Sequence, residues 1–198
     1  MCNEQSNRVA AGLIRDDIQQ LRIPLDFPEG LPNLEPRDSI RITDRNAILR
    51  TAAGGTGAEL VVRRWSWPGP GGRPVYNFRS EGRRFPHGRC LIVADAFYEF
   101  TDPPPDAPKR ARKTKWRFTK AGEAWFAIAG LWRADPQVGE AYTMLTGAPG
   151  PDIAPYHDRQ VLVLERSDWA AWLAAETTAP EALLAPSPLG TFAVEQVA

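Results

Sequence analysis

Cys2 is the residue of this chain with the most distinctive chemistry. A small second residue normally permits removal of Met1, which would leave Cys2 as the amino terminus. Its α-amine would then titrate near about pH 7.7–8.0, so a useful fraction is nucleophilic at neutral pH. With the thiol, this amine can condense with an aldehyde, first to an imine and then to a thiazolidine ring. For Cys2 alone, a frayed terminus with an accidental cysteine is the better-supported alternative.

Two further residues could transfer protons. Glu99 ends the run Ala94–Phe100, where aromatic neighbours would desolvate its carboxyl group and raise its pKa. His157 lies in Tyr-His-Asp-Arg directly before an apolar segment, and a histidine at a strand edge can act as an acid or base. An exposed strand carboxylate and a structural histidine are the respective alternatives.

A polar face follows Tyr76. Asn77, Arg79 and Glu81 alternate with aromatic or small residues, so in a strand all three would project from one face. The Arg79 guanidinium is suited to binding a phosphate. The alternative is the solvent face of a half-buried strand.

Cofactor and metal chemistry find no support in the sequence. Two histidines and two cysteines show no ligand spacing, so we expect no metal site. Gly-x-Gly-x-x-Gly, phosphate-loop and Gly-x-Ser-x-Gly patterns are lacking, and we expect no small-molecule cofactor. Cys90 precedes Leu-Ile-Val and is expected to be a buried thiol.

The charge is unevenly distributed along 198 residues of zero net charge. Residues 60–120 carry 14 basic and five acidic residues, interleaved with aromatic residues, as a polyanion-binding face would be. A solvated basic surface is the alternative, and we favour it for the tract Lys109, Arg110, Arg112, Lys113 and Lys115. That tract follows three prolines, and residues 103–114 are predicted to form a mobile loop.

Short strands dominate the expected secondary structure. A helix is predicted over residues 8–22. A second helix is predicted to begin at a Ser167 cap and to bury Trp169, Trp172 and Leu173, and a short third helix to run from Pro180 through Leu184. The expected strands are Ser39–Thr43, Ala47–Arg50, Glu59–Trp67, Arg89–Phe100, Lys115–Thr119, Ala124–Arg133, Ala141–Thr146, Gln160–Leu164 and Gly190–Val197.

This order of elements predicts an α+β fold with a largely antiparallel, barrel-like β core and a few flanking helices. No composition shift divides the chain, so residues 1–198 are expected to form one domain. We expect no membrane span and no secretory signal, hence a cytoplasmic, nucleoid-associated protein that acts as a monomer.

Several segments together resemble the SOS response-associated peptidase (SRAP) family. Asn33 with Pro36 and Arg64–Pro68 are similar to two supporting family segments. The principal matches are Cys2, Asn77–Glu81, Arg89–Phe100, Ala129–Trp132 and His157–Arg159, in family order over nearly the whole chain.

The resemblance implies a protein that shields abasic sites in single-stranded DNA through a covalent cross-link. It implies that Cys2 is the nucleophile, that Asn77 orients the amine and sugar, and that Glu99 is the acid/base. His157 would assist proton transfer at the sugar hydroxyl. The DNA-binding residues that it implies are Arg79, Arg159, Trp65, Trp67 and Asn33.

The start of the chain departs from the family pattern. Many members read Cys-Gly-Arg-Phe, whereas this chain continues Asn3-Glu4-Gln5, so the DNA contact of that arginine is lost or comes from elsewhere. Ala96 and Ser66 replace usual glycines, and Gln160 replaces a usual Met or Arg.

Two other functions remain open from the sequence. Cys2, His157 and Glu99 could form the nucleophile, base and carboxylate of a thiol peptidase that acts only on its own leader. Alternatively, arginines and aromatic residues could bind single-stranded DNA without catalysis.

Overall fold

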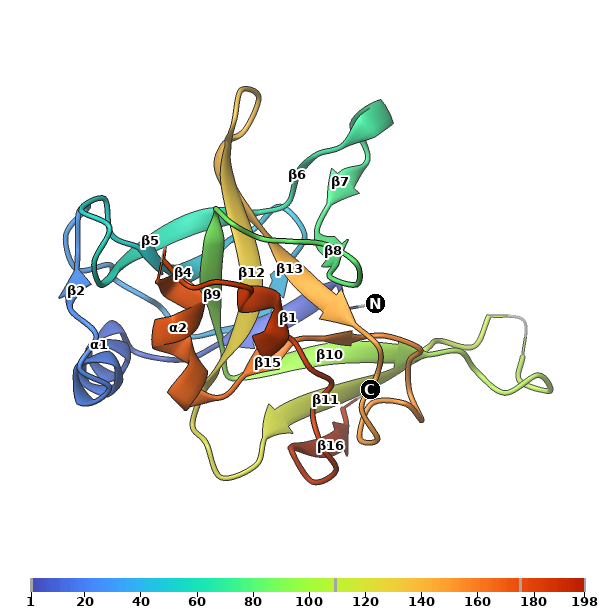
Figure 1. Cartoon of the computed structure of the whole chain (residues 1–198). Helices are drawn as coiled ribbons and strands as arrows, with labels where there is room; N and C mark the ends of the chain where they lie inside the picture. The colour runs from blue at the N-terminus through green and yellow to red at the C-terminus, as the bar shows by residue number, and fades with distance from the viewer. Residues whose placement is uncertain (1, 109, 175, 198) are drawn as a thin grey trace.

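Five strands close into a barrel at the centre of the computed structural model, which describes residues 2–108, 110–174 and 176–197 (Figure 1). Their order is β5-β4-β9-β12-β13, and β13 returns to β5 through the parallel pairs Ala141–Arg64 and Tyr142–Trp65. This confirms the predicted barrel-like core. The barrel strands are β4 (Arg45–Thr51), β5 (Ala58–Trp65), β9 (Arg89–Ala94), β12 (Phe126–Asp135) and β13 (Gly139–Gly147).

A second, fully antiparallel sheet packs against one end of the barrel (Figure 1). Its order is β16-β11-β10-β1-β3, so the first strand of the chain lies between two others. Phe97 and Phe118 of this sheet pack in one core cluster with Phe126 of the barrel. The strands are β1 (Glu4–Asn7), β3 (Arg37–Arg41), β10 (Ala96–Thr101), β11 (Thr114–Lys120) and β16 (Phe192–Gln196).

Shorter elements surround these two sheets. Two α-helices, α1 (Ala11–Gln20) and α2 (Trp169–Leu173), occur in the described part of the chain. The short strands are β2 (Leu25–Asp26), β6 (Trp67–Pro68), β7 (Pro74–Val75), β8 (Asn77–Arg79), β14 (Gln160–Val161) and β15 (Val163–Leu164). The 3-10 helices are η1 (Pro70–Gly72), η2 (Arg166–Asp168) and η3 (Pro180–Leu183).

Strand β9 is apolar from Cys90 to Ala94 because both of its faces are covered. Leu91 and Val93 belong to the core cluster beneath α1 and α2, whereas Cys90 and Ile92 point into the other cluster with Phe97. Successive side chains alternate between faces of a sheet, so one continuous apolar run serves two cores. Cys2 and Cys90 are both free and buried, as expected for Cys90, whereas a frayed terminus at Cys2 is contradicted.

The single strand predicted over Arg89–Phe100 is wrong, since Asp95 divides it between the two sheets. Strand β9 belongs to the barrel and β10 to the second sheet. The Asp95 carboxylate holds Arg8 at 2.7 Å, and its backbone N–H donates to Ser6 O. The break re-aims the chain so that Glu99 lies in the second sheet beside β1.

Other boundaries also differ from prediction. Leu162 divides the predicted strand Gln160–Leu164 into β14, which pairs with β13, and β15, which pairs with β12. Ser66 interrupts Glu59–Trp67 with a φ of 80°, a left-handed conformation that ends β5. Ser167 does not cap α2, because it lies inside η2 and its hydroxyl reaches Asp168 rather than the helix backbone. Helix α2 nevertheless buries the predicted Trp169, Trp172 and Leu173.

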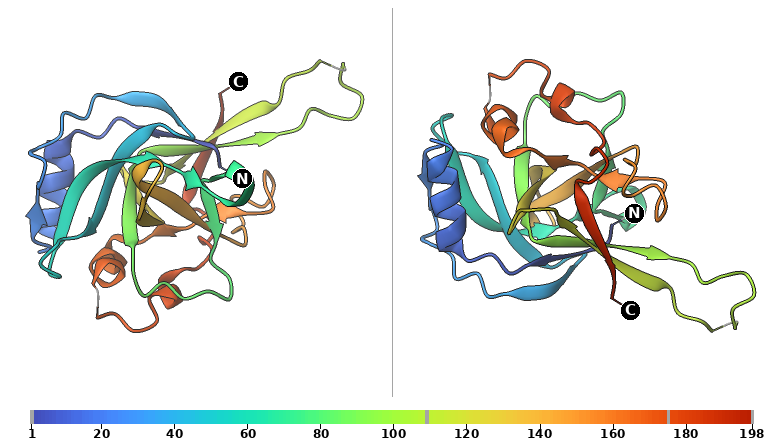
Figure 2. Two further views of the ribbon diagram at one scale, coloured as in Figure 1. Left: turned by 90° about the horizontal axis from the view of Figure 1, so that it is seen from above. Right: turned by 90° about the horizontal axis from the view of Figure 1, so that it is seen from below.

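The β10–β11 hairpin projects beyond the rest of the molecule (Figure 2). Residues 102–113 join the two strands without helix or strand in the described positions, and Lys109 of the predicted basic tract lies outside them. Lys113 Nζ lies 2.8 Å from Asp102 Oδ1 at the base of this loop. Its mobility stays a prediction.

Candidate active site

Cys2 lies two residues before β1, and its side chain is buried in the protein interior. Cys2 is 1% exposed, and its thiol donates to Glu4 O at 3.2 Å. Burial raises the pKa of this thiol, and the nearby charge of Glu99 raises it further. The side chain is therefore a protonated thiol at neutral pH, which disfavours spontaneous thiolate chemistry.

Asn77 fixes the backbone beside Cys2. Strand β8 pairs in parallel with β13, and there Asn77 Nδ2 donates to Cys2 O at 2.7 Å. The Asn77 Oδ1 atom is buried and has no partner among the described residues. An unpaired buried acceptor is costly, so this oxygen is suited to accept a hydrogen bond from a bound group.

Glu99 lies on β10 next to Cys2 and is 2% exposed. Burial raises the pKa of this carboxyl group to about 7, although a hydrogen bond from the Cys2 backbone acts in the opposite direction. Protonated and ionised forms therefore coexist at neutral pH, as acid/base catalysis requires. The sequence prediction of a raised pKa for Glu99 is confirmed.

His157 and Glu99 both line a hollow with a volume of about 310 Å³. His157 lies in the loop that joins β13 to β14, residues 148–159, and its backbone N–H donates to Ile153 O at 3.0 Å. Its Nδ1 lies 3.0 Å from the Arg159 amide nitrogen and 2.7 Å from Asp158 Oδ1. Burial lowers the pKa of His157, which favours the neutral imidazole.

The structure thus brings together the four residues predicted to be catalytic. Cys2 contacts Asn77 and Glu99, and Glu99 shares its hollow with His157. Asn3, Phe100 and Lys113 complete the lining, and no sequence pattern singled them out as site residues. Lys113 belongs to the tract interpreted as a solvated loop. The antiparallel pairing of β10 with β11 brings it next to Glu99 in space.

The two predicted phosphate-binding arginines differ in their surroundings. Arg79 is exposed at the end of β8. Arg159 is held by Glu81 in a two-point ion pair of 2.8 and 2.9 Å, and it also donates to Thr146 O at 2.9 Å. The carboxylate partner of Arg159 thus lies 78 positions away in the chain.

Trp65 and Trp67, which the family resemblance implies as DNA-binding residues, are both buried, so neither ring can stack on a DNA base in this structure. Trp65 is fully buried, stacks on Tyr142 and donates its indole N–H to Tyr76 O at 2.9 Å. Trp67 is 7% exposed and lies under the Arg133 guanidinium. The half-buried aromatic residues nearer the hollow are Phe100, Trp116 and Tyr156.

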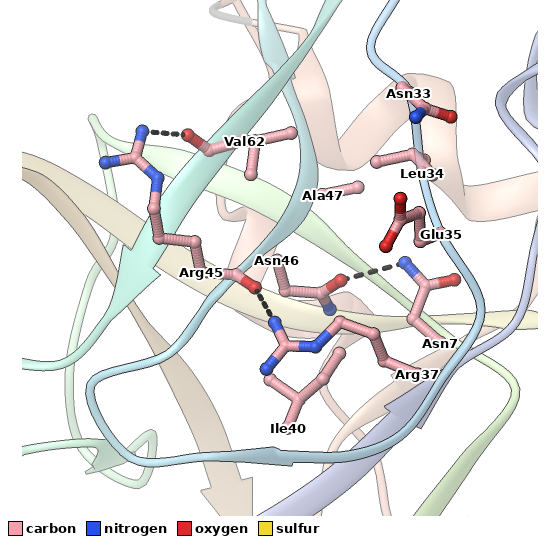
Figure 3. A pocket seen from close by; sticks show the side chains of 10 residues that line it. All are labelled: Asn7, Asn33, Leu34, Glu35, Arg37, Ile40, Arg45, Asn46, Ala47 and Val62. Atoms are coloured by element: carbon pink, nitrogen blue, oxygen red, sulfur yellow. Dashed lines mark hydrogen bonds between the residues drawn. The ribbon is translucent and has the colours of Figure 1, made fainter.

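Asn33 lies in a different hollow, of about 260 Å³ (Figure 3). Its neighbours there include Asn7 and Asn46, whose amide groups are joined by a 2.8 Å hydrogen bond. This hollow has no lining residue in common with the one that holds Glu99. Asn33 is therefore not assembled with the predicted catalytic residues.

Within the described residues, no three His, Cys, Asp or Glu side chains cluster as metal ligands. In the same residues, none of the helices has the length and apolar character needed to cross a bilayer.

A family model described as SOS response associated peptidase (SRAP) matches residues 75–198, more than half of the chain. The protein belongs to the SRAP family. The match includes Asn77, Glu99 and His157, while Cys2 precedes it.

Relatives of this SRAP protein extend the match toward the amino terminus. The abasic site processing proteins YobE and YoaM of Bacillus subtilis (strain 168) are 29% and 28% identical to it. Each alignment covers 85% of this chain, and 81% and 78% of YobE and YoaM respectively. A crystal structure of a Bordetella bronchiseptica protein, 23% identical, superimposes with a TM-score of 0.68 and full coverage of both chains. That structure supports the fold of the SRAP protein described here.

Proposed function

We propose that this protein captures abasic sites in single-stranded DNA through a covalent cross-link to Cys2. One observation carries the proposal: Asn77 holds Cys2 beside a hollow lined by Glu99 and His157. Membership of a family with relatives named abasic site processing proteins supports an abasic sugar as the target. The ring-opened form of that sugar is an aldehyde, which an amino-terminal cysteine captures.

The reaction balances without a cofactor. The Cys2 α-amine, freed by removal of Met1, attacks the aldehyde carbon, and loss of water gives an imine. The thiol sulfur then adds to the imine carbon while its proton passes to the nitrogen, which closes a thiazolidine. This ring closure is intramolecular and therefore strongly favoured.

Each neighbouring residue has a role in these steps. Glu99, with a pKa of about 7, donates a proton to the departing hydroxyl and accepts one from the thiol. Asn77 orients the Cys2 backbone, and its open Oδ1 accepts a hydrogen bond from the amine or sugar. His157, neutral because of burial, assists proton transfer at the sugar hydroxyl.

A peptidase is the second candidate because the family description names one. A thiol peptidase attacks with a thiolate, and burial of Cys2 disfavours that form. The aldehyde reaction needs no thiolate for its first bond, because the amine makes it. Hydrolysis of unrelated peptides by the purified protein would favour the peptidase.

Reaction with a single-stranded oligonucleotide that carries one abasic site tests the proposal. We expect a DNA adduct that survives boiling in denaturant, with the intact mass of a condensation product. Cys2→Ala abolishes the stable adduct, and Cys2→Ser gives no long-lived one, because neither variant can form the sulfur-containing ring. A blocked amino terminus has the same effect.

Two outcomes would contradict the proposal. A heat-stable adduct of Cys2→Ala without added reductant would rule out the thiazolidine. Binding that disappears on boiling for the wild-type protein would indicate a non-covalent single-strand binder.

A further inference from the structure

A second hollow, of about 380 Å³, lies next to the one that holds Glu99 and His157. Asn3 and Phe100 line both of them, so the two hollows share a wall. Its other lining residues are Glu4, Arg41, Ile42 and Lys115. None of these four belongs to the predicted catalytic or DNA-binding set.

Strand pairing places the charged residues of this second hollow on one face of the sheet. Glu4 lies opposite Arg41 on β3 and opposite Tyr98 on β10, while Phe100 lies opposite Lys115 on β11. Directly opposed residues of antiparallel strands project to the same side. Two cations, two aromatic rings and one carboxylate are therefore gathered on one face of the sheet, and Asn3 and Phe100 connect this face to the hollow lined by Glu99.

Lys115 is held by its neighbours rather than extended into solvent. Its Nζ lies 2.8 Å from Glu4 Oε1 and 4.0 Å from the centroid of the Tyr98 ring. Burial alone would raise the pKa of Glu4, but hydrogen bonds from Lys115 and Ser39 more than offset this, and the pKa lies below its usual value. Glu4 is thus ionised at neutral pH and offsets one of the two cations.

We propose that this second hollow binds the nucleotide next to the abasic site, with its phosphate on Arg41 and Lys115 and its base against Phe100. This inference rests on the proposed function, since it assigns the path of the same DNA strand. A strand whose abasic sugar reaches Glu99 can continue only across the surrounding surface, and here cations and a half-buried ring adjoin that point. Aromatic stacking and cationic phosphate contacts are how proteins hold single strands without sequence preference.

Replacing Glu4 should change DNA affinity in the opposite direction to replacing Arg41 or Lys115. The phosphate must compete with the Glu4 carboxylate for Lys115, so Glu4 weakens DNA binding in the wild-type protein. Glu4→Gln should therefore tighten binding, whereas Arg41→Ala and Lys115→Met should weaken it. A residue with only a structural role would not produce opposite effects of this kind.

The test uses oligonucleotides that carry a tetrahydrofuran abasic analogue, which cannot open to an aldehyde, so that binding is measured without cross-linking. Nucleotides are trimmed one at a time from either side of the analogue. In the wild-type protein, loss of one particular flanking nucleotide should cost about three- to tenfold in affinity. That step should vanish in Arg41→Ala, and the salt dependence should flatten by about 0.7 in log–log slope.

Arg15→Ala and Glu176→Gln are matched controls, because the Arg15 side chain is 44% exposed, Glu176 is exposed, and neither lines the two hollows. Identical trimming profiles for wild type, Arg41→Ala and Glu4→Gln would overturn the inference. Cross-linking of a natural abasic site by the wild-type protein is measured in parallel. If that adduct forms, the proposed function survives a failure of the second hollow; if it does not, the proposed function itself fails.

Discussion

At the scale of single residues, the burial of Glu99 controls its protonation near neutral pH. Its pKa of about 7 places a usable acid and a usable base in the same hollow as His157. Glu99→Gln should slow cross-linking by about 10²–10⁴-fold, because the amide neither gives nor takes a proton. Rates measured from pH 6 to pH 8 should show an inflection near pH 7 in the wild type and none in the variant. A variant that reacts at the wild-type rate across this range would remove Glu99 from the mechanism.

The same carboxyl group links folding stability to pH. Its pKa is raised from 4.5 in the unfolded chain to about 7 in the fold, so the folded protein binds this proton more tightly. The associated stability is fully present below about pH 4.5 and is lost as the pH rises through about 7. The free energy of unfolding of wild type should therefore fall between pH 5 and pH 8 relative to that of Glu99→Gln. Denaturant titrations at both pH values measure this, and equal pH dependence in the two proteins would contradict it.

At the scale of elements, the residues that carry chemistry were easier to predict than the strands that hold them. Cys2, Glu99 and His157 have side chains whose reactivity can be inferred from residue type and neighbours. Strand β1 was not predicted, because Glu4-Gln5-Ser6-Asn7 contains no apolar residue. All four residues are buried, and distant residues bond some of their polar atoms: the Gln5 amide N–H donates to the Tyr142 hydroxyl at 2.9 Å, whereas Gln5 Oε1 and Ser6 Oγ have no partner among the described residues.

Contacts between distant parts of the chain explain the other errors. Trp65 and Trp67 lie in a basic, aromatic stretch typical of a DNA-binding face, yet both rings are buried in the fold. Asp95 occurs inside an apolar run, and its contacts with Arg8 and Ser6, both distant in sequence, accompany the point where the chain changes sheet. Local sequence patterns contain no information about the distant residues that bury the two tryptophans or pair with Asp95.

Barrel packing around β12 predicts a large effect from a single added methyl group. A Cβ on Gly130 would lie 2.6 Å from Ile92 Cδ1, 2.9 Å from Thr143 O and 3.0 Å from Cys90 Sγ. Gly130→Ala should destabilise the protein by about 1–3 kcal/mol through overpacking. Gly12→Ala in α1 is the control: nothing lies within 4 Å of its added Cβ. This control should not destabilise the protein and should gain less than the roughly 0.5–1 kcal/mol of a helix interior, because Gly12 lies in the first turn of α1. Denaturant unfolding compares the two, and equal stabilities would contradict the packing argument.

At the scale of the whole molecule, zero net charge conceals a basic middle third that the fold only partly leaves available. Arg159 is committed to Glu81, whereas Arg79 is exposed beside Asn77. Arg79→Ala should weaken single-strand binding irrespective of sequence and flatten the log–log salt slope by about 0.7. Cross-linking at saturating DNA should suffer less than affinity. Titrations at several salt concentrations test this, and an unchanged affinity and slope would assign Arg79 a structural role.

The central position of β1 in its sheet also constrains how the protein is made. Cys2 leaves the ribosome first, but its partners Asn77, Glu99 and His157 follow 75 or more residues later. At about 5–20 residues per second, roughly 8–30 s of synthesis separate Cys2 from His157. During that interval the Cys2 side chain is not yet buried, and insertion of β1 between β3 and β10 ends its exposure. If Cys2 captures aldehydes as proposed, folding protects it from soluble aldehydes as well as positioning it.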